Sequence, residues 1–310
     1  MRTFVRRERW GTPQQLAKRA RRIFGSPTWW ARSRSFGVDI RPELTDGIRG
    51  EWLEPRGPLP GLILYVHGGG YVACSAVTHR PVTAALARMT QRKVFSLEYR
   101  LAPEHPFPAA FDDALAAYRW IVAHEEPSQL AFVGDSAGGG LVLAVLVAAR
   151  DAGLPMPAVA VLYSPWTDME GTAEAGTSDS EKCAMFAPAN IHDFGNAYLD
   201  TASRRDVRAS PGLADLSGLP PILIQAGDTE LLLGDAARVD RSIRQHGGSS
   251  ELHVFEHVFH GWQMLDGLMP EATAALRQSA DFVCDHLEPG TAGALPRRAA
   301  NIHISETHAN

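Results

Sequence analysis

The chain has 310 residues, of which 45% are hydrophobic and 21% charged, and its formal net charge is −5. This composition is that of an ordinary globular protein, and the length suffices for one large domain with an appendage. The longest uncharged apolar stretch, near residues 138–149, is far shorter than the roughly 20 residues of a membrane span, so we expect no transmembrane segment.

The three cysteines, Cys74, Cys183 and Cys284, are widely spaced. They indicate neither a disulfide framework nor a zinc site, and they favour a reducing compartment. We therefore expect a cytoplasmic protein.

The positive charge is concentrated at the N-terminus. Residues 1–34 hold ten Arg or Lys side chains and a single acid, Glu8. Such a segment can contact nucleic acid or an acidic membrane surface, or it can be a helix docked on an acidic body. We favour the docked helix and expect no nucleic-acid partner. This helix would carry Ile23, Phe24, Trp29 and Trp30 toward the mouth of a site. It lacks the apolar core of a signal peptide, so secretion is not expected.

Along the chain, apolar strand-like runs alternate with helical stretches. We expect strands at residues 47–54, 62–66, 94–98, 130–134, 158–163, 222–226 and 252–256. We expect helices at residues 78–90, 107–125, 136–152, 231–246 and 271–287. Alternation of this kind predicts an α/β fold with a mostly parallel central sheet flanked by helices, and an active site at the carboxyl ends of the strands.

The alternation lapses between Trp166 and Leu219, apart from a helical patch at residues 188–199. A segment this long is not a plain loop in a compact domain. We therefore expect a helical cap built from residues 1–45 and 166–212. The catalytic domain would comprise residues 46–165 and 213–288, and residues 289–310 would form a loose tail.

Ser136 stands between glycines in Gly134–Gly139, directly after an apolar strand and before a helix. A strand that turns at once into a helix makes a sharp elbow, where side chains flanking the serine would crowd it. The serine hydroxyl would thereby be exposed to substrate. The N–H of Ala137, at the helix N-terminus, would donate to a developing oxyanion, and Asp135 would accept hydrogen bonds that brace the elbow.

A second flexible loop, His67–Gly70, follows the strand at residues 62–66. Its glycines let the backbone approach a carbonyl closely enough to place two more N–H donors near the oxygen. We expect Gly68 and Gly69 to supply them. A serine elbow together with an oxyanion loop is what acyl transfer needs.

His260 lies in a loop after the last expected strand and precedes a glycine. The order of oxyanion loop, nucleophile, acid and histidine is the order that the α/β-hydrolase arrangement requires. We therefore predict that His260 is the general base, with His257 as the reserve.

Four motifs occur together in this order: His67–Tyr71, Tyr99–Pro108, Gly134–Gly139 and His260–Trp262. With them, residues 62–287 resemble the hormone-sensitive-lipase-like bacterial esterases of the α/β-hydrolase superfamily. The resemblance implies a serine carboxylesterase that acts on short acyl esters under a helical cap. It also implies that no metal or organic cofactor is needed. Relatives often pair through an edge strand, so a homodimer is possible.

The third catalytic residue departs from the commoner family pattern, in which an Asp precedes Pro-Leu. Here Asp228 and Glu230 compete for that place. Aligning Leu232 with the family's Leu puts Glu230 where the Asp stands. The interval to His260 is then similar to the family's. We favour Glu230 as the catalytic acid and interpret Asp228 as a helix-capping acid.

Four aromatic residues are candidates for substrate binding: Tyr71, Phe186, Phe194 and Tyr198. Each can either line an acyl site or pack the cap onto the body, and the sequence leaves both interpretations open.

Other functions remain open as well. An N-acetyl amide hydrolase of a small metabolite would use the same catalytic residues. A non-catalytic binder on the same fold would be expected to lack the histidine. The run Gly68–Ala73 also formally fits a dinucleotide-binding motif, with Glu98 as the ribose-binding acid, and this would make the chain an NAD(P)-dependent oxidoreductase. However, Glu98 is about ten residues farther along the chain than is usual.

Overall fold

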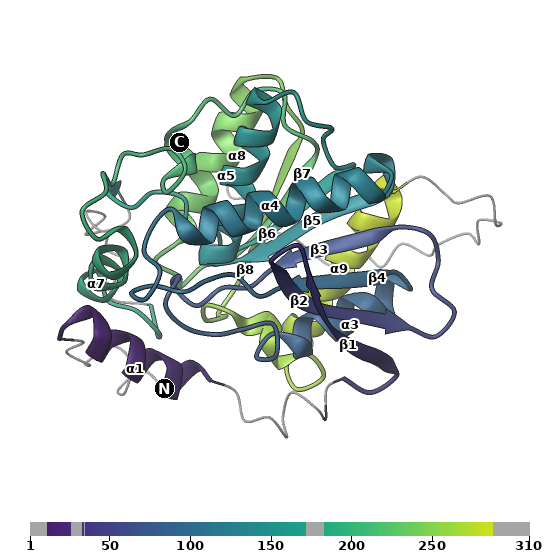
Figure 1. Cartoon of the computed structure of the whole chain (residues 1–310), viewed down its shortest axis with the longest axis horizontal. Coiled ribbons are helices and arrows are strands. Elements are labelled where there is room, and N and C mark those ends of the chain that lie inside the picture. Colours follow the sequence, from purple (N-terminus) through teal and green to yellow (C-terminus); the bar gives the residue numbers. More distant parts are fainter. Residues whose placement is uncertain (1–10, 26–32, 34, 172–182, 288–310) are drawn as a thin grey trace.

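The computed structural model describes residues 11–25, 33, 35–171 and 183–287 (Figure 1). Trp29, Trp30 and the expected tail at residues 289–310 lie outside this part. Its centre is one eight-stranded sheet with the order β1-β2-β4-β3-β5-β6-β7-β8. Strand β2 pairs antiparallel with β1 and β4, and every other neighbouring pair is parallel. The expected α/β-hydrolase architecture is confirmed.

The expected strands and helices are all present, with small shifts at their ends. The strands of the sheet are β1 (Val38–Thr45), β2 (Ile48–Pro55), β3 (Leu62–Val66), β4 (Lys93–Leu97), β5 (Leu130–Asp135), β6 (Val159–Tyr163), β7 (Ile222–Gly227) and β8 (Ser250–Phe255). The helices are α1 (Pro13–Phe24), α3 (Arg80–Thr90), α4 (Ala109–His124), α5 (Ala137–Asp151), α7 (Pro188–Leu199), α8 (Leu233–Gln245) and α9 (Pro270–His286).

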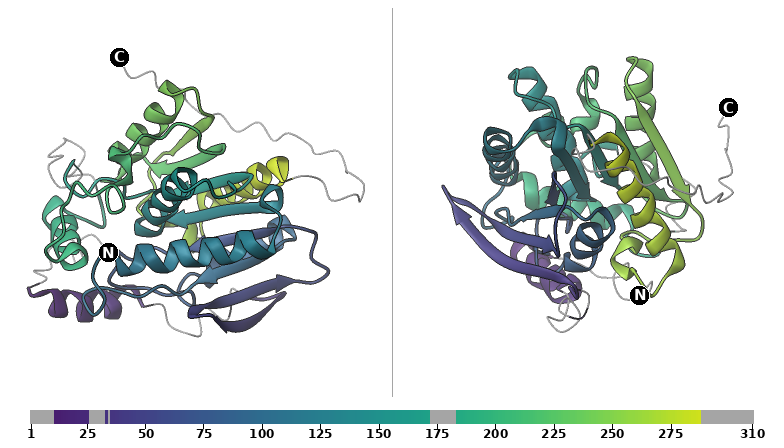
Figure 2. Two further views of the ribbon diagram at one scale, coloured as in Figure 1. Left: turned by 45° about the horizontal axis from the view of Figure 1, so that its top comes forward. Right: turned by 90° about the vertical axis from the view of Figure 1, so that its right-hand side faces the viewer.

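Helices cover both faces of the sheet (Figure 2). Helices α4, α5 and α8 pack on one face, and α3 and α9 pack on the other. Strands β3, β6 and β7 are buried along their whole length, because helices cover them on both sides.

The prediction placed residues 38–45 in the cap, and this is wrong: they form strand β1 at the edge of the sheet. Strand β1 pairs with β2 from Val38 opposite Pro55 to Thr45 opposite Ile48. The hairpin turns at Asp46 and Gly47, whose φ angles are 53° and 81°. Both residues of a type I′ turn have positive φ, and Asp-Gly is a favoured sequence for it. Proline in a strand is tolerated at an edge, which explains the place of Pro42.

Helices α1 and α7 lie side by side at one end of the molecule (Figure 1). Helix α1 begins at a capping box, in which the Thr12 hydroxyl accepts from the Gln15 N–H and the Gln15 side chain accepts from the Thr12 N–H. It buries Leu16, Ala17 and Ala20 in the main core. None of the helices in the described part of the chain combines the length and the apolar character that crossing a membrane requires.

Candidate active site

Ser136 lies in the turn between β5 and α5, with φ 52° and ψ −121°. This backbone conformation is unusual for a residue with a side chain and is typical of a nucleophile elbow. Glycine is required around the serine: a Cβ at Gly138 would come within 2.1 Å of the Val66 carbonyl oxygen, and one at Gly134 within 2.6 Å of the Gly138 oxygen. Asp135 accepts hydrogen bonds at the elbow, as predicted, from the Tyr65 hydroxyl and the Gly68 N–H.

The structure corrects one residue of the predicted oxyanion loop. The Gly68 N–H donates to Asp135 Oδ1 at 2.9 Å, so it is already engaged. In the described part of the chain, the N–H groups of Gly69, Gly70 and Ala137 have no protein acceptor. Gly69 and Gly70 have φ angles of 114° and 61°, which turn the loop toward the cavity that both residues line. The prediction missed Gly70 because consecutive glycines do not show which N–H a distant carboxylate will take.

His260 and Glu230 form a buried pair. The Nδ1 atom of His260 lies 2.6 Å from Glu230 Oε2. The other oxygen, Oε1, accepts from the Ser164 hydroxyl at 2.7 Å and from the Gly227 N–H at 2.8 Å. Ser164 follows β6, so three strand ends converge on this carboxylate. Nothing in the sequence around Ser164 indicates this contact.

The reserve candidates Asp228 and His257 contact each other instead of the cavity. Asp228 Oδ1 accepts the His257 N–H at 2.7 Å, and the imidazole of His257 is 87% exposed. Neither residue lines the cavity that holds Ser136 and His260. Geometry therefore favours Glu230 and His260 over this exposed pair.

A cavity of about 300 Å³ lies between the body and the cap, and Ser136 and His260 both line it. Its wall on the cap side is apolar and consists of Ile23, Phe24, Met185, Phe186, Ile191 and Phe194. The rings of Phe186 and His260 meet edge to face, with centroids 5.5 Å apart. Phe186 and Phe194 thus line the cavity, which is one of the two interpretations that the sequence left open.

Tyr71 and Tyr198 do not line the cavity, and the predicted contact with substrate is corrected. Their rings stack at 3.7 Å, at an interplanar angle of 7°, and both are fully buried. Tyr71 follows the glycine loop and Tyr198 lies near the end of α7, so the stack joins cap to body. Burial of two large aromatic faces stabilises this contact.

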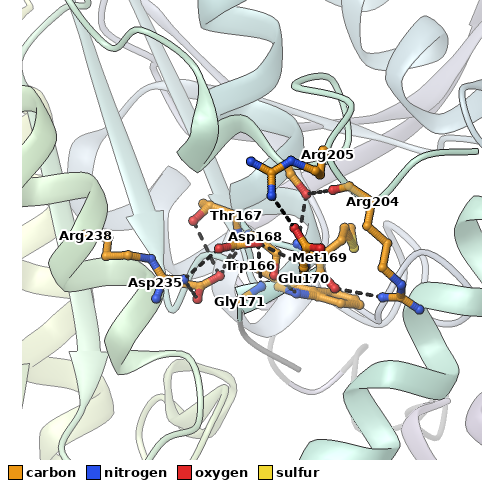
Figure 3. Close-up of polar contacts among 11 residues, drawn as sticks. Trp166, Thr167, Asp168, Met169, Glu170, Gly171, Arg204, Arg205, Asp235 and Arg238 are labelled. Carbon is orange, nitrogen blue, oxygen red and sulfur yellow. Dashed lines mark hydrogen bonds and ion pairs between the residues drawn. The ribbon is translucent and has the colours of Figure 1, made fainter. Parts of the chain in front are cut away.

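The first residues of the cap segment are held by buried charge (Figure 3). Asp235, in the first turn of α8, accepts the N–H groups of Thr167 at 2.8 Å and Asp168 at 3.1 Å and pairs with Arg238 at 2.6 Å. Asp168 in turn accepts the N–H groups of Glu170 and Gly171. This network ties the start of the cap to the helix that follows Glu230.

The environment of His260 suits a general base. Burial alone would lower its pKa, but the charge and hydrogen bond of Glu230 outweigh burial and raise the pKa above its usual value. Because Nδ1 is bound to Glu230, Nε2 remains to exchange a proton with a group in the cavity.

The dinucleotide-binding alternative does not fit the structure. Helix α3 begins only at Arg80, far past the glycines, so its N-terminus does not follow them directly. Glu98 accepts the N–H of Ala76 at 2.8 Å and is engaged within the protein.

Known proteins show the same fold and family. A family model described as alpha/beta hydrolase fold matches residues 63–264. An acetyl-hydrolase from Streptomyces hygroscopicus is 36% identical over 274 residues, which cover 87% of this chain and 89% of that protein. An esterase from Acinetobacter venetianus is 33% identical over 247 residues, which cover 79% of this chain and 82% of that protein. The crystal structure of an esterase from the bacterial hormone-sensitive lipase family has a TM-score of 0.83 at 36% identity, covering 92% of this chain and 94% of that one.

The match of the family model and the likeness to these relatives show that the chain belongs to the α/β-hydrolase family. Within that family it is similar to the esterases of the hormone-sensitive lipase group, as the sequence motifs implied. In enzyme class the chain is a carboxylic ester hydrolase.

Proposed function

We propose that the chain is a serine carboxylesterase that hydrolyses short-chain acyl esters of small molecules through an acyl-enzyme. The observation that carries this proposal is the 2.6 Å contact of His260 with Glu230 beside a cavity that Ser136 also lines. A nucleophile, a base and a residue that orients the base are the parts that this chemistry needs.

The proposed reaction begins with attack of the Ser136 hydroxyl oxygen on the ester carbonyl, while its proton passes to Nε2 of His260. The carbonyl electrons move to the oxygen, which accepts hydrogen bonds from the N–H groups of Gly69, Gly70 and Ala137. Collapse of this intermediate breaks the bond to the alcohol, which takes the proton from His260. Water then attacks the acyl-enzyme, with His260 again accepting a proton, and the carboxylic acid is released as Ser136 regains its proton.

The cavity supports a small, uncharged acyl group. Its volume of about 300 Å³ lies at the lower end of the range for ligand pockets. Phe186 and Phe194 belong to its apolar wall, where a charged group would lose hydration without gaining a partner. The acetyl-hydrolase relative from Streptomyces hygroscopicus agrees with a short acyl group.

Ser136→Ala tests the proposal. We expect it to lower kcat for p-nitrophenyl esters by several orders of magnitude, because triad residues act as a unit. Wild type should favour short esters in a panel from two to sixteen carbons, and a serine-reactive phosphonate should add its mass to Ser136. A Ser136→Ala protein that keeps most of its ester hydrolysis would contradict the proposal. Faster cleavage of an N-acetyl amide than of any ester would favour the deacetylase alternative.

Assembly and location stay predictions from the sequence. A homodimer would form through an edge strand of the sheet, and size-exclusion chromatography with light scattering tests it. A cytoplasmic location is a prediction from the cysteine content.

A further inference from the structure

The carboxylate of Asp135 connects the two loops on which the proposed mechanism depends. Asp135 directly precedes Ser136, and its Oδ1 accepts the N–H of Gly68 at 2.9 Å and the hydroxyl of Tyr65 at 2.8 Å. The loops touch: a Cβ at Gly68 would lie 2.2 Å from Asp135 Oδ2 and 3.0 Å from the Ser136 Cβ. One carboxylate therefore holds the glycine loop against the elbow.

His79 engages the other oxygen of this carboxylate. Its Nε2 lies 3.2 Å from Asp135 Oδ2, and its side chain is only 5% exposed. Its Nδ1 lies 3.0 Å from the Thr78 hydroxyl, which itself donates to the Ser75 carbonyl. The hydroxyl proton is used there, and Nδ1 also lies 3.3 Å from the Ser75 carbonyl oxygen, which can only accept, so Nδ1 carries a proton. With a proton at each nitrogen, His79 is an imidazolium.

The surrounding groups agree with a charge on His79. Burial lowers its pKa, but the charge and hydrogen bond of Asp135 outweigh burial and raise it, and the Glu98 carboxyl adds to the rise. The ring of His67 lies 5.5 Å away. Burial and the charge of His79 lower the pKa of His67 to about 3, so His67 is neutral. Asp135 and the buried His79 therefore form an ion pair that lines the reaction cavity.

We propose that His79 and Asp135 form a charged positioning pair that fixes the segment His67–Gly70. The pair keeps the Asp135 carboxylate ionised and in place, and Asp135 holds the Gly68 N–H. The next two N–H groups, those of Gly69 and Gly70, are then directed at the oxyanion of the transition state. This inference rests on the proposed function. Neither His79 nor Asp135 exchanges a proton with substrate, so losing the pair should weaken transition-state binding and leave ground-state binding intact.

The experiment compares His79→Gln, Asp135→Asn and the double variant with wild type. His253→Gln is the matched control, because His253 pairs with Glu251 at 3.4 Å and does not line the cavity. The measurements are kcat and KM for p-nitrophenyl acetate, and the inhibition constants of an alkyl trifluoromethyl ketone and of the matching methyl ketone. The trifluoromethyl ketone forms an oxyanion adduct with the serine, whereas the methyl ketone reports ground-state binding.

We expect His79→Gln to lower kcat by about 10- to 100-fold with KM within about threefold of wild type, since misdirected donors act only in the transition state. Binding of the trifluoromethyl ketone should weaken by the same factor by which kcat/KM falls, and binding of the methyl ketone should not change. The double variant should be no slower than the slower single variant, because both residues act through one contact. His253→Gln should match wild type.

Three results would overturn the proposal. One is a folded His79→Gln protein whose kcat stays within about threefold of wild type. Such a decrease is smaller than the one caused by removing a single oxyanion donor. Another is an equal loss of affinity for both ketones together with a lower melting temperature, which indicates general structural damage. The third is multiplicative effects in the double variant. If Asp135→Asn does not fold, His79→Gln decides alone. Activity lost in Ser136→Ala but kept in His79→Gln would overturn the positioning pair and leave the proposed function in place.

Discussion

Glu230 holds His260 with one carboxylate oxygen and is itself held by the other. Oε2 lies 2.6 Å from His260 Nδ1, while Oε1 accepts from the hydroxyl of Ser164 and the N–H of Gly227. With both oxygens engaged, the carboxylate cannot rotate freely. It therefore fixes a proton on Nδ1 and leaves Nε2 as the basic nitrogen.

Glu230→Gln should lower kcat for p-nitrophenyl acetate by roughly 1,000- to 10,000-fold, because an amide no longer stabilises the imidazolium and allows the wrong tautomer. Asp228→Asn is the matched control. Since Asp228 contacts His257 at the surface, this variant should stay close to wild type. Steady-state kinetics of both proteins checks the assignment. Loss of turnover in Asp228→Asn alone would show that Glu230 is not the catalytic acid.

The pH dependence of kcat/KM should report His260. The residue acts as a base only when neutral, so the rate rises as pH increases through its pKa, which Glu230 raises above 6.5. In Glu230→Gln the raising charge is absent and burial remains, so the acid limb of the residual activity should move to lower pH. A pH–rate profile of both proteins measures the shift. An acid limb at the same pH in both would mean that Glu230 does not set this pKa.

Arg21 should tether helix α1 over the cavity. Its guanidinium pairs with Glu104 at 2.6 Å and donates to the carbonyls of Val72 and Ala102, and α1 also carries the cavity residues Ile23 and Phe24. Arg21→Met removes every one of these bonds. We expect kcat/KM for p-nitrophenyl butyrate to fall by about 3- to 10-fold, with a smaller loss for the acetate ester, whose acyl group reaches less of the wall.

Glu104→Gln serves as the control for this tether. The Arg21 and Glu104 side chains are 38% and 54% exposed, and an ion pair so exposed contributes at most about 1 kcal/mol. The variant keeps the two bonds from Arg21 to the carbonyls and should stay within about twofold of wild type. Equal decreases in kcat/KM in Glu104→Gln and Arg21→Met would show that the effect comes from the ion pair and not from the bonds of Arg21 to the two carbonyls.

Asp235→Ala should destabilise the protein because it leaves the N–H groups of Thr167 and Asp168 without their acceptor and Arg238 without its main partner. Two buried donors without partners cost about 2–5 kcal/mol in the free energy of unfolding. Urea unfolding measures the change. Arg205→Ala is the control, since its 72% exposed side chain pairs with Glu170 at the surface and should change stability by less than about 1 kcal/mol. A similar decrease in the free energy of unfolding in both variants would contradict the stabilising role of the buried bonds to Asp235.

The order of the elements, the elbow at Ser136 and the histidine after the last strand could all be predicted from the sequence. These features depend on local chemistry. Apolar periodicity distinguishes strand from helix, and the elbow needs glycine at positions next to the serine. Strands β2 to β8, the helices and the patch at Pro188–Leu199 therefore agree with the prediction. Strand β1 was missed although its Asp-Gly turn was visible, because Pro42 weakened the strand pattern.

Which groups meet across the fold could not be predicted from the sequence. Gly68 and Gly70 look alike in the sequence, but Asp135 takes the N–H of Gly68, whereas that of Gly70 has no acceptor among the residues that the structure describes. Tyr71 and Tyr198, far apart in the chain, stack in the join between cap and body instead of lining the cavity. A hydrogen bond or a ring contact depends on the positions of both partners. Those positions follow from how the strands and the cap pack, which no local pattern encodes.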